Sequence, residues 1–268
     1  MYYIPYLIKN KPVVCRVYQP TNISIENLRE TNVLFIKFAS LRNTMTYWKN
    51  YWNSVAQNKS PFIQVQRDGM SEVDLLKIQK HVCLLLDLKP NDDLLDLCCG
   101  NGLLTNRLTP YCKSIIGIDF STELIKSANK MYQKKNLNFI EGDVANLSHL
   151  TNTKFDKILL YFSFQYFNSK QGSLIVSEMK KLLKPGGLIL IGDIPDKAKF
   201  WRYYDSFLKR AFYFKQWLFS QPKMGKFWSK KEMGKLAKQT KLKGSYLVQK
   251  KDLPNSHYRF DYIFSCYR

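Results

Sequence analysis

Two glycines in one short stretch are the first residues whose types and spacing indicate chemistry. Gly100 and Gly102 stand in LLDLCCGNGLL, between an apolar run and a segment that can start a helix. Glycines at such a turn let the backbone approach a ligand without a Cβ atom, and the helix start offers unpaired N–H groups. The spacing differs from the dinucleotide fingerprint G-x-G-x-x-G, because no third glycine precedes Leu103. The turn predicts a nucleotide-like ligand.

Two aspartates follow at the ends of the next two apolar runs. Asp119 ends SIIGID, about 20 residues after the turn, where a carboxylate can accept hydrogen bonds from both hydroxyls of a ribose. Asp143 follows LNFIEG, where it can hold the amino group of an adenine while Phe120 packs on the ring. The duller alternatives are that the glycines only make a tight turn and that the aspartates are caps.

Five stretches, in this order, resemble the successive motifs of class I S-adenosylmethionine-dependent methyltransferases: LLDLCCGNG, GIDF, EGDV, FDKILLYFSFQYF and LLKPGGLILIGD. The resemblance covers residues 71–268 and implies S-adenosylmethionine as the cofactor. It implies that Asp96 and the two glycines surround the methionine part, that Asp119 holds the ribose, and that Val144 lies with Asp143 at the adenine. The cofactor-binding residues expected are Asp96, Cys98, Gly100, Asn101, Gly102, Asp119, Phe120, Asp143, Val144 and Tyr161, the last closing the site after the fourth strand.

A narrower resemblance concerns TYWKNYWNS, PFIQVQRDG, YFSFQYF and DLPNSHYRFD. Together they are similar to a subgroup of largely uncharacterised bacterial methyltransferases, many assigned from gene neighbourhood to glycan or natural-product pathways. That subgroup has QVGRT where this chain has QVQRD, so Gln66 and Asp68 depart from its pattern and the role of Arg67 is not carried over.

The acceptor of the methyl group is expected at the carboxyl ends of the strands, where ligands gather in open α/β sheets. The residues expected to bind it are Arg67, Gln165, Tyr166, Asp193, Tyr258 and Arg259. Because the sulfonium methyl is already activated, alignment and desolvation supply most of the rate, and a base is needed only for acceptors such as a hydroxyl. The candidate catalytic residues are Tyr161 and His257; the histidine is the candidate base, because an unperturbed imidazole titrates near neutrality. The alternatives are a structural turn role for His257 and packing roles for Tyr161 and Tyr166.

Short apolar runs that alternate with amphipathic segments must position these residues. The runs predict strands buried on both faces, and therefore a parallel sheet with helical crossovers. The strands expected are 93–98, 114–119, 137–142, 157–162, 187–192, 244–249 and 259–267, and the helices expected include 71–88, 121–135, 173–184 and 228–240. Gly186 and Gly187 are expected to end the third of these helices. The fold class is α/β, a three-layer sandwich whose seven-stranded, mostly parallel sheet has an antiparallel last strand and helices on both faces.

Charge is concentrated in one part of the chain. The 268 residues carry a formal charge of +21, and residues 197–251 hold 16 Lys and Arg against Asp205 and Glu232, a net +14. Such a segment usually forms solvated helices with buried rings. The alternatives are a lid over an anionic or lipid-linked acceptor, an anionic membrane surface, or a nucleic-acid surface.

We expect three regions: an N-terminal extension of unknown role (1–44), an N-terminal helix or lid segment (45–70), and the methyltransferase domain (71–268) with a basic aromatic helical insert at about 197–230. No CxxC pair indicates a metal site, and neither a leader nor a membrane span is evident, so a cytoplasmic location is expected.

The function that these features favour is methyl transfer to an O or N atom of a small molecule, such as a glycan or natural product. An RNA methyltransferase is the second hypothesis, although YFSFQYF stands where enzymes that methylate exocyclic amines have an Asn/Asp-Pro-Pro-aromatic loop. A non-catalytic partner subunit that binds the cofactor is the third.

Overall fold

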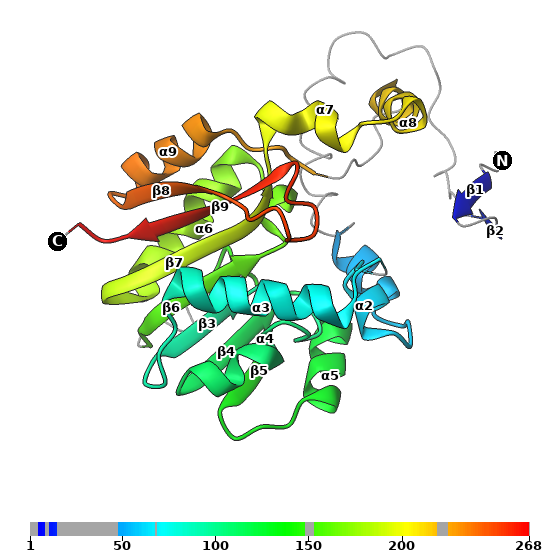
Figure 1. Ribbon diagram of the computed structural model, residues 1–268. Helices are drawn as coiled ribbons and strands as arrows, with labels where there is room; N and C mark the ends of the chain where they lie inside the picture. Colours follow the sequence, from blue (N-terminus) through cyan, green and yellow to red (C-terminus); the bar gives the residue numbers. More distant parts are fainter. Residues whose placement is uncertain are drawn as a thin grey trace, which may run out of the picture. The chain divides into compact units, whose positions relative to one another are not determined.

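The computed structural model describes residues 48–67, 69–147, 153–218 and 225–267, and the backbone of a hairpin near the N-terminus. The chain divides into two compact units, Met1–Tyr47 and Trp48–Arg268. In the first, strands β1 (Pro5–Ile8) and β2 (Lys11–Val14) pair antiparallel. The rest of the predicted extension lies outside the described residues, and everything below concerns the second unit (Figure 1).

Seven strands form one sheet in the order β5-β4-β3-β6-β7-β9-β8. They are β3 (Asp93–Leu97), β4 (Ser114–Asp119), β5 (Leu137–Glu141), β6 (Phe155–Tyr161), β7 (Leu183–Pro195), β8 (Lys243–Val248) and β9 (Arg259–Ser265). The pairs from β5 through β7 are parallel, whereas β9 runs antiparallel between β7 and β8. The predicted fold class, including its antiparallel last strand, is confirmed.

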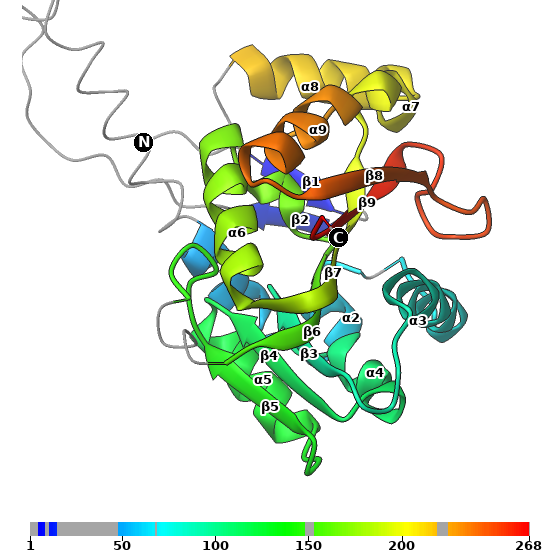
Figure 2. The ribbon, with the colours of Figure 1, turned by 90° about the vertical axis from the view of Figure 1, so that its left-hand side faces the viewer.

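Helices cover both faces of the sheet, which is why the central strands are mostly apolar. The helices and 3-10 turns of the described residues are α2 (Pro61–Gln64), α3 (Glu72–Leu86), α4 (Thr105–Leu108), η2 (Thr109–Tyr111), α5 (Thr122–Met131), η4 (Phe164–Tyr166), α6 (Ser169–Leu182), η5 (Lys197–Lys199), α7 (Phe200–Tyr203), α8 (Phe207–Leu218) and α9 (Lys230–Gln239); residues 48–55 are also helical. Figure 2 shows α3 on one side of the sheet and α6 with α9 on the other. The amphipathic segments predicted as helices thus form the two outer layers.

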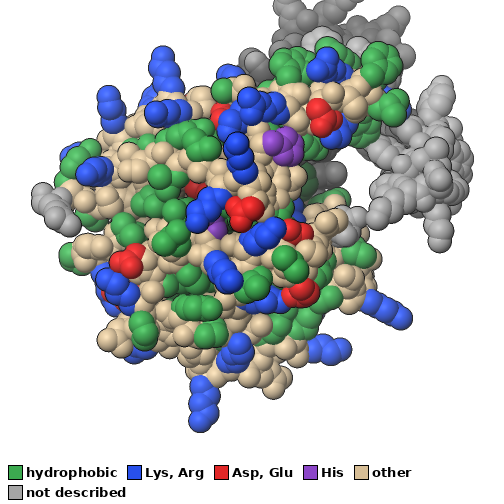
Figure 3. All heavy atoms as spheres, viewed as in Figure 1, with side chains coloured by type: hydrophobic (Ala, Val, Ile, Leu, Met, Phe, Trp, Pro, Cys, Tyr) green, Lys and Arg blue, Asp and Glu red, His purple; other side chains and the backbone are tan. Residues whose placement is uncertain are grey.

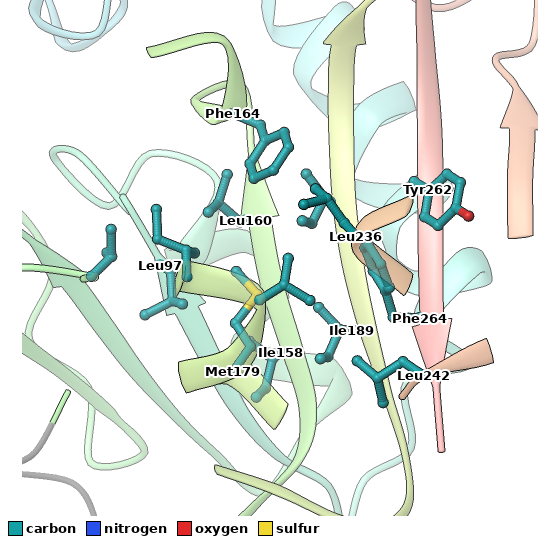
Figure 4. Packing of buried hydrophobic residues seen from close by; sticks show 14 of the residues in the cluster. Leu97, Ile158, Leu160, Phe164, Met179, Ile189, Leu236, Leu242, Tyr262 and Phe264 are labelled. Atoms are coloured by element: carbon teal, nitrogen blue, oxygen red, sulfur yellow. The ribbon is translucent and has the colours of Figure 1, made fainter. Parts of the chain in front are cut away.

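The two faces of the sheet have separate apolar cores. On one face, Met179 of α6 and Leu236 of α9 pack with Leu160 of β6 and Phe264 of β9 (Figure 4). On the other, α3 packs its apolar side on β3 and β6. Ser71 begins α3 with the predicted capping box, in which its side chain and that of Asp74 each accept the other's backbone N–H.

The prediction that glycines end the helix before β7 was wrong. Helix α6 stops at Leu182, the chain is already extended at Leu183, and Gly186 and Gly187 lie inside β7. Pro185 disfavours a helical conformation in the residue before it, which explains the early end. Gly187 instead permits a close approach, because a Cβ atom there would lie 2.7 Å from the carbonyl oxygen of Asp156.

The predicted helical insert follows β7 as α7 and α8. The amino end of α9 then returns to the sheet, with Ser229 as its N-cap and Glu232 completing a capping box. Among the helices that the structure describes, none is long and apolar enough to cross a membrane.

Candidate active site

The turn after β3 requires unusual backbone conformations. Cys98, Gly100 and Gly102 have φ angles of 58°, 59° and 76°, all in the left-handed region. The N–H of Gly100 donates to Oδ2 of Asp119 at 3.0 Å, which attaches the turn to the end of β4. A Cβ atom on Gly102 would lie 2.4 Å from the ring of Phe139, so packing as well as φ requires glycine there.

Asp119 is fixed by two backbone bonds, one to each carboxylate oxygen. Besides the bond from Gly100, its Oδ1 accepts the N–H of Ser121 at 2.9 Å. Burial of this carboxyl raises its pKa to about 6. Each oxygen keeps a second lone pair, so the group can still accept hydrogen bonds from two hydroxyls.

Asp96 lies on the face of the sheet that α4 covers. It is 4% exposed and accepts the hydroxyl of Thr105 at 2.6 Å. Burial, helped by the charge of Asp119, raises the pKa of Asp96 to about 7. The residues expected at the adenine differ in exposure: Asp143 is exposed at the end of β5, whereas Val144 is buried in the core. Their contacts with a cofactor stay predictions.

Asn101 connects the glycine turn to the N-terminal part of the domain. Its side chain is fully buried, and Nδ2 donates to the carbonyl of Pro61 and to Oε1 of Gln64, both at 2.9 Å. Its Oδ1 accepts the N–H of Leu103 at 3.2 Å. The Asn101 amide is therefore engaged with α2, a role that its expected place at the cofactor did not include.

Residues 48–67, here called the cover segment, contact the carboxyl ends of several strands. Asn53 accepts the hydroxyl of Ser121 after β4 at 2.7 Å. Lys49 forms an ion pair of 3.0 Å with Glu141 at the end of β5. The ring of Trp48 lies 4.7 Å from that of Tyr166, which follows β6.

The side chains of Asn53 and Gln64 were not anticipated as site residues. Gln64 is 7% exposed, and its Oε1 accepts from Asn101 and also from Ser127 of α5 at 2.9 Å. Both stand in stretches that carry the narrower resemblance, Asn53 in TYWKNYWNS and Gln64 in PFIQVQRDG, but that resemblance assigned them no role. The cover segment thus lies over the edge of the sheet where the glycine turn and Asp119 meet.

Six residues were expected at the acceptor. Two of them follow β6, Asp193 lies near the end of β7, two lie at the start of β9, and Arg67 comes from the cover segment. The structure brings them into one group, here called the arginine cluster: Arg67, Gln165, Tyr166, Asp193, Tyr258 and Arg259. Its neighbour on the cofactor side is Cys98, whose thiol interacts with Ser163 and Tyr166. The group therefore borders the glycine turn.

The centre of the arginine cluster is a buried ion pair. Nη1 of Arg259 lies 2.9 Å from Oδ2 of Asp193 and also donates to the carbonyl of Asp193; each side chain is 5% exposed. Burial opposes the charge of Arg259, but Asp193 together with Tyr258 and Tyr166 outweighs it, and the pKa of Arg259 is raised. The guanidinium of Arg67 lies 4.1 Å over the ring of Phe162, and burial lowers its pKa against the attraction of Asp193. Two cations therefore face one carboxylate.

Asp193 has a strained backbone that a second carboxylate holds in place. Its φ angle is 57°, and its N–H donates to Oδ1 of Asp261 at 2.8 Å. Asp261 is fully buried, bonds Nε2 of His81 at 2.7 Å and accepts from Gln249 at 2.9 Å. This network reaches from α3 through β9 to β7 and fixes the carboxylate that pairs with Arg259.

Two buried polar atoms of the arginine cluster have no hydrogen-bond partner in the described part of the chain. They are Oε1 of Gln165 and Nε of Arg259. Gln165 is 3% exposed and Arg259 is 4% exposed, so neither atom is solvated in compensation. Such groups cost free energy until a ligand satisfies them.

The two candidate catalytic residues lie next to the arginine cluster. His257 is exposed in the turn before β9, its ring packs on Tyr258 at 4.8 Å, and its carbonyl accepts from Arg202. Tyr161 is 4% exposed in the core beneath α3, and burial raises its pKa well above its ordinary value. This geometry favours a turn role for His257 and packing for Tyr161; the catalytic roles stay untested predictions.

Comparison with known proteins identifies the type of domain and the fold. Residues 94–187 match the family model of a methyltransferase domain. The crystal structure of the N-methyltransferase NodS from Bradyrhizobium japonicum, in complex with S-adenosyl-L-homocysteine, covers 82% of this chain and 98% of its own with a TM-score of 0.59 and 17% identity. The fold is that of S-adenosylmethionine-dependent methyltransferases.

Two relatives are similar to this chain over less than half of its length. An uncharacterized methyltransferase of Schizosaccharomyces pombe is 30% identical over 118 residues, which are 40% of this chain and 40% of the relative. A demethylmenaquinone methyltransferase of Corynebacterium kroppenstedtii is 30% identical over 128 residues, 47% of this chain and 53% of that protein. The chain therefore spans about half or less of these relatives' lengths.

Proposed function

We propose that the protein is an S-adenosylmethionine-dependent methyltransferase whose acceptor is a small molecule with an acidic, oxygen-bearing group. The observation that carries this proposal is the arrangement of Asp119 and the glycine turn beside the arginine cluster. Two comparisons support it: residues 94–187 match the family model of a methyltransferase domain, and the structurally similar NodS binds S-adenosyl-L-homocysteine.

The described residues fit the cofactor. Asp119 has lone pairs left for two ribose hydroxyls, and the N–H of Gly100 fixes this carboxylate beside the glycine turn. When bound, the cofactor supplies an electrophilic methyl group on a positive sulfur. The cover segment would exclude water from it through the contacts of Asn53 and Gln64.

The arginine cluster suits an anionic acceptor. Arg259 is paired with Asp193, whereas the guanidinium of Arg67 lies over the ring of Phe162, and burial strengthens its attraction for an anion. An acidic hydroxyl held there would ionise without a base, which fits a cluster whose predicted base, His257, lies exposed in a turn. The name of the Corynebacterium relative, a demethylmenaquinone methyltransferase, supports a ring acceptor of this kind.

The cofactor is tested by calorimetry with S-adenosylhomocysteine. We expect binding by the wild type, loss of binding in Asp119→Ala, and unchanged binding in the control Glu178→Ala, whose carboxylate pairs with Lys181 on the surface of α6. Circular dichroism would confirm that each variant is folded. A wild type that does not bind would remove the cofactor from the proposal.

The acceptor is tested with methyl-labelled cofactor and fractionated lysate of the native cell. Label in an acidic small molecule, lost in Arg67→Met, supports the proposal. Label in RNA would favour the nucleic-acid hypothesis instead. Cofactor binding without transfer to any fraction would favour a non-catalytic partner subunit.

A further inference from the structure

Helix α8 exposes apolar side chains that a helix of a globular protein normally buries. Phe207 and Leu208 are 83% and 79% exposed, and Phe214 is 56% exposed. Positions 207, 211 and 214 follow the spacing of one helical face. Trp201 of α7 is 51% exposed beside them. The apolar side of this insert therefore faces outward.

The opposite side of α8 is packed, so its orientation is fixed. Tyr213 lies 5.2 Å from Phe200 and 4.9 Å from Tyr204, ring to ring. Nε of Arg210 donates to the carbonyl of Tyr204 at 3.0 Å. Because these contacts hold Tyr213 inward, Phe207 and Phe214 are directed away from the protein.

Positive charge surrounds the exposed apolar face. Residues 197–215 contain six Lys and Arg against one acid, Asp205, which pairs with Lys209 at 2.9 Å. Arg202 and Lys215 are exposed. Figure 3 shows green apolar and blue basic side chains together at the upper right, where α7 and α8 lie in Figure 1. Basic residues that flank exposed Phe, Trp and Leu are the pattern of helices that lie in a membrane interface.

The same insert borders the arginine cluster. The ring of Tyr203, the last residue of α7, lies 5.0 Å from the ring of Tyr258. The guanidinium of Arg259 lies 4.9 Å from the centroid of the Tyr258 ring. An aromatic path therefore leads from the exposed face of α8 to the site proposed for the acceptor.

We propose that the exposed face of α7 and α8 binds the surface of an anionic lipid bilayer, from which a lipid-soluble acceptor reaches Arg259 past Tyr203 and Tyr258. The choice of acceptor rests on the proposed function, whereas membrane binding does not. A bilayer fits better than RNA, because Leu208 cannot stack on bases and an apolar helix face gains from burial in acyl chains.

The test is co-sedimentation of the full chain with vesicles of phosphatidylcholine, with and without phosphatidylglycerol. We expect binding to the anionic vesicles that weakens with salt, and little binding to phosphatidylcholine alone. The double variant Phe207→Ser/Phe214→Ser should bind anionic vesicles about tenfold more weakly than the wild type. The double variant Arg202→Glu/Lys215→Glu should no longer prefer vesicles that contain anionic lipid. Leu84→Ser is the control, since Leu84 is 63% exposed on α3.

Two results would overturn the proposal. One is a wild type that does not bind anionic vesicles or binds them as well as Phe207→Ser/Phe214→Ser does. The other is self-association of the wild type, measured by light scattering, that this variant abolishes without any vesicle binding, which would make a second copy of the chain the occupant. Calorimetry with S-adenosylhomocysteine on the same samples separates these results from a failure of the cofactor assignment.

Discussion

The glycine turn and the arginine cluster are neighbours, yet they satisfy their polar groups differently. At the turn, both oxygens of Asp119 and the amide of Asn101 are bonded within the chain. In the arginine cluster, buried atoms of Gln165 and Arg259 lack partners among the described residues. A site that leaves buried polar atoms unpaired until a ligand binds discriminates strongly against ligands that cannot pair them. Under the proposed function, affinity for a common cofactor comes from the turn and selectivity for the acceptor comes from the cluster.

Removing a guanidinium from the arginine cluster should have the largest effect on catalysis. Arg67→Met leaves the buried pair of Arg259 and Asp193 intact and removes one of the two cations that face the acceptor. We expect kcat/KM for methyl transfer to fall about 100-fold, while the affinity for S-adenosylhomocysteine stays unchanged. Steady-state kinetics and calorimetry measure the two quantities. Equal losses in both would show that the cluster and the turn are one unit.

The pH dependence of protein stability tests the burial of Asp96 in β3, next to the turn. Burial raises its pKa to about 7, so the folded protein binds a proton that the unfolded chain has already lost. Stability attributable to this group is full below about pH 4 and falls as the pH rises to about 7, by roughly 2–4 kcal/mol. In Asp96→Asn, which can still accept the hydroxyl of Thr105, urea unfolding should show a flatter pH dependence and higher stability at pH 8. An unchanged slope would assign the titration to another group.

Asn101 tests whether the cover segment is held by the turn. In Asn101→Ala the donors to Pro61 and Gln64 are lost, which should cost about 1 kcal/mol or more. We expect faster amide hydrogen exchange in residues 48–67 and unchanged exchange in α6. Thr240→Ala, which removes hydroxyl bonds to carbonyls at the end of α9, is the matched control. Unaltered exchange in the cover segment would mean that its other contacts suffice.

The sequence predicted which residues form the turn and the cluster, but not how the cluster residues pair. Strands β3 and β4 are largely buried, so their apolar runs, and Asp119 at the end of β4, can be recognised from the sequence. The pairing of Arg259 with Asp193 depends on the antiparallel register that places Pro195 opposite Arg259, and no local pattern encodes that register. Likewise, Asn53 and Ser121 are 68 residues apart, and their contact follows from how the cover segment lies on the sheet.

The smallest effect is expected at His257, which marks the outer limit of the arginine cluster. Its side chain is exposed and packs on the ring of Tyr258. Its backbone carbonyl accepts a hydrogen bond from Arg202, and alanine at this position would keep that bond. If the acceptor ionises between the guanidiniums, no imidazole is needed, and His257→Ala should change kcat/KM less than about twofold at any pH between 6 and 8. A pH profile of transfer is the measurement. A pH dependence of kcat/KM that is present in the wild type and absent in His257→Ala would restore His257 as the base. The acceptor would then be a neutral hydroxyl, because only that acceptor requires a side chain to remove its proton.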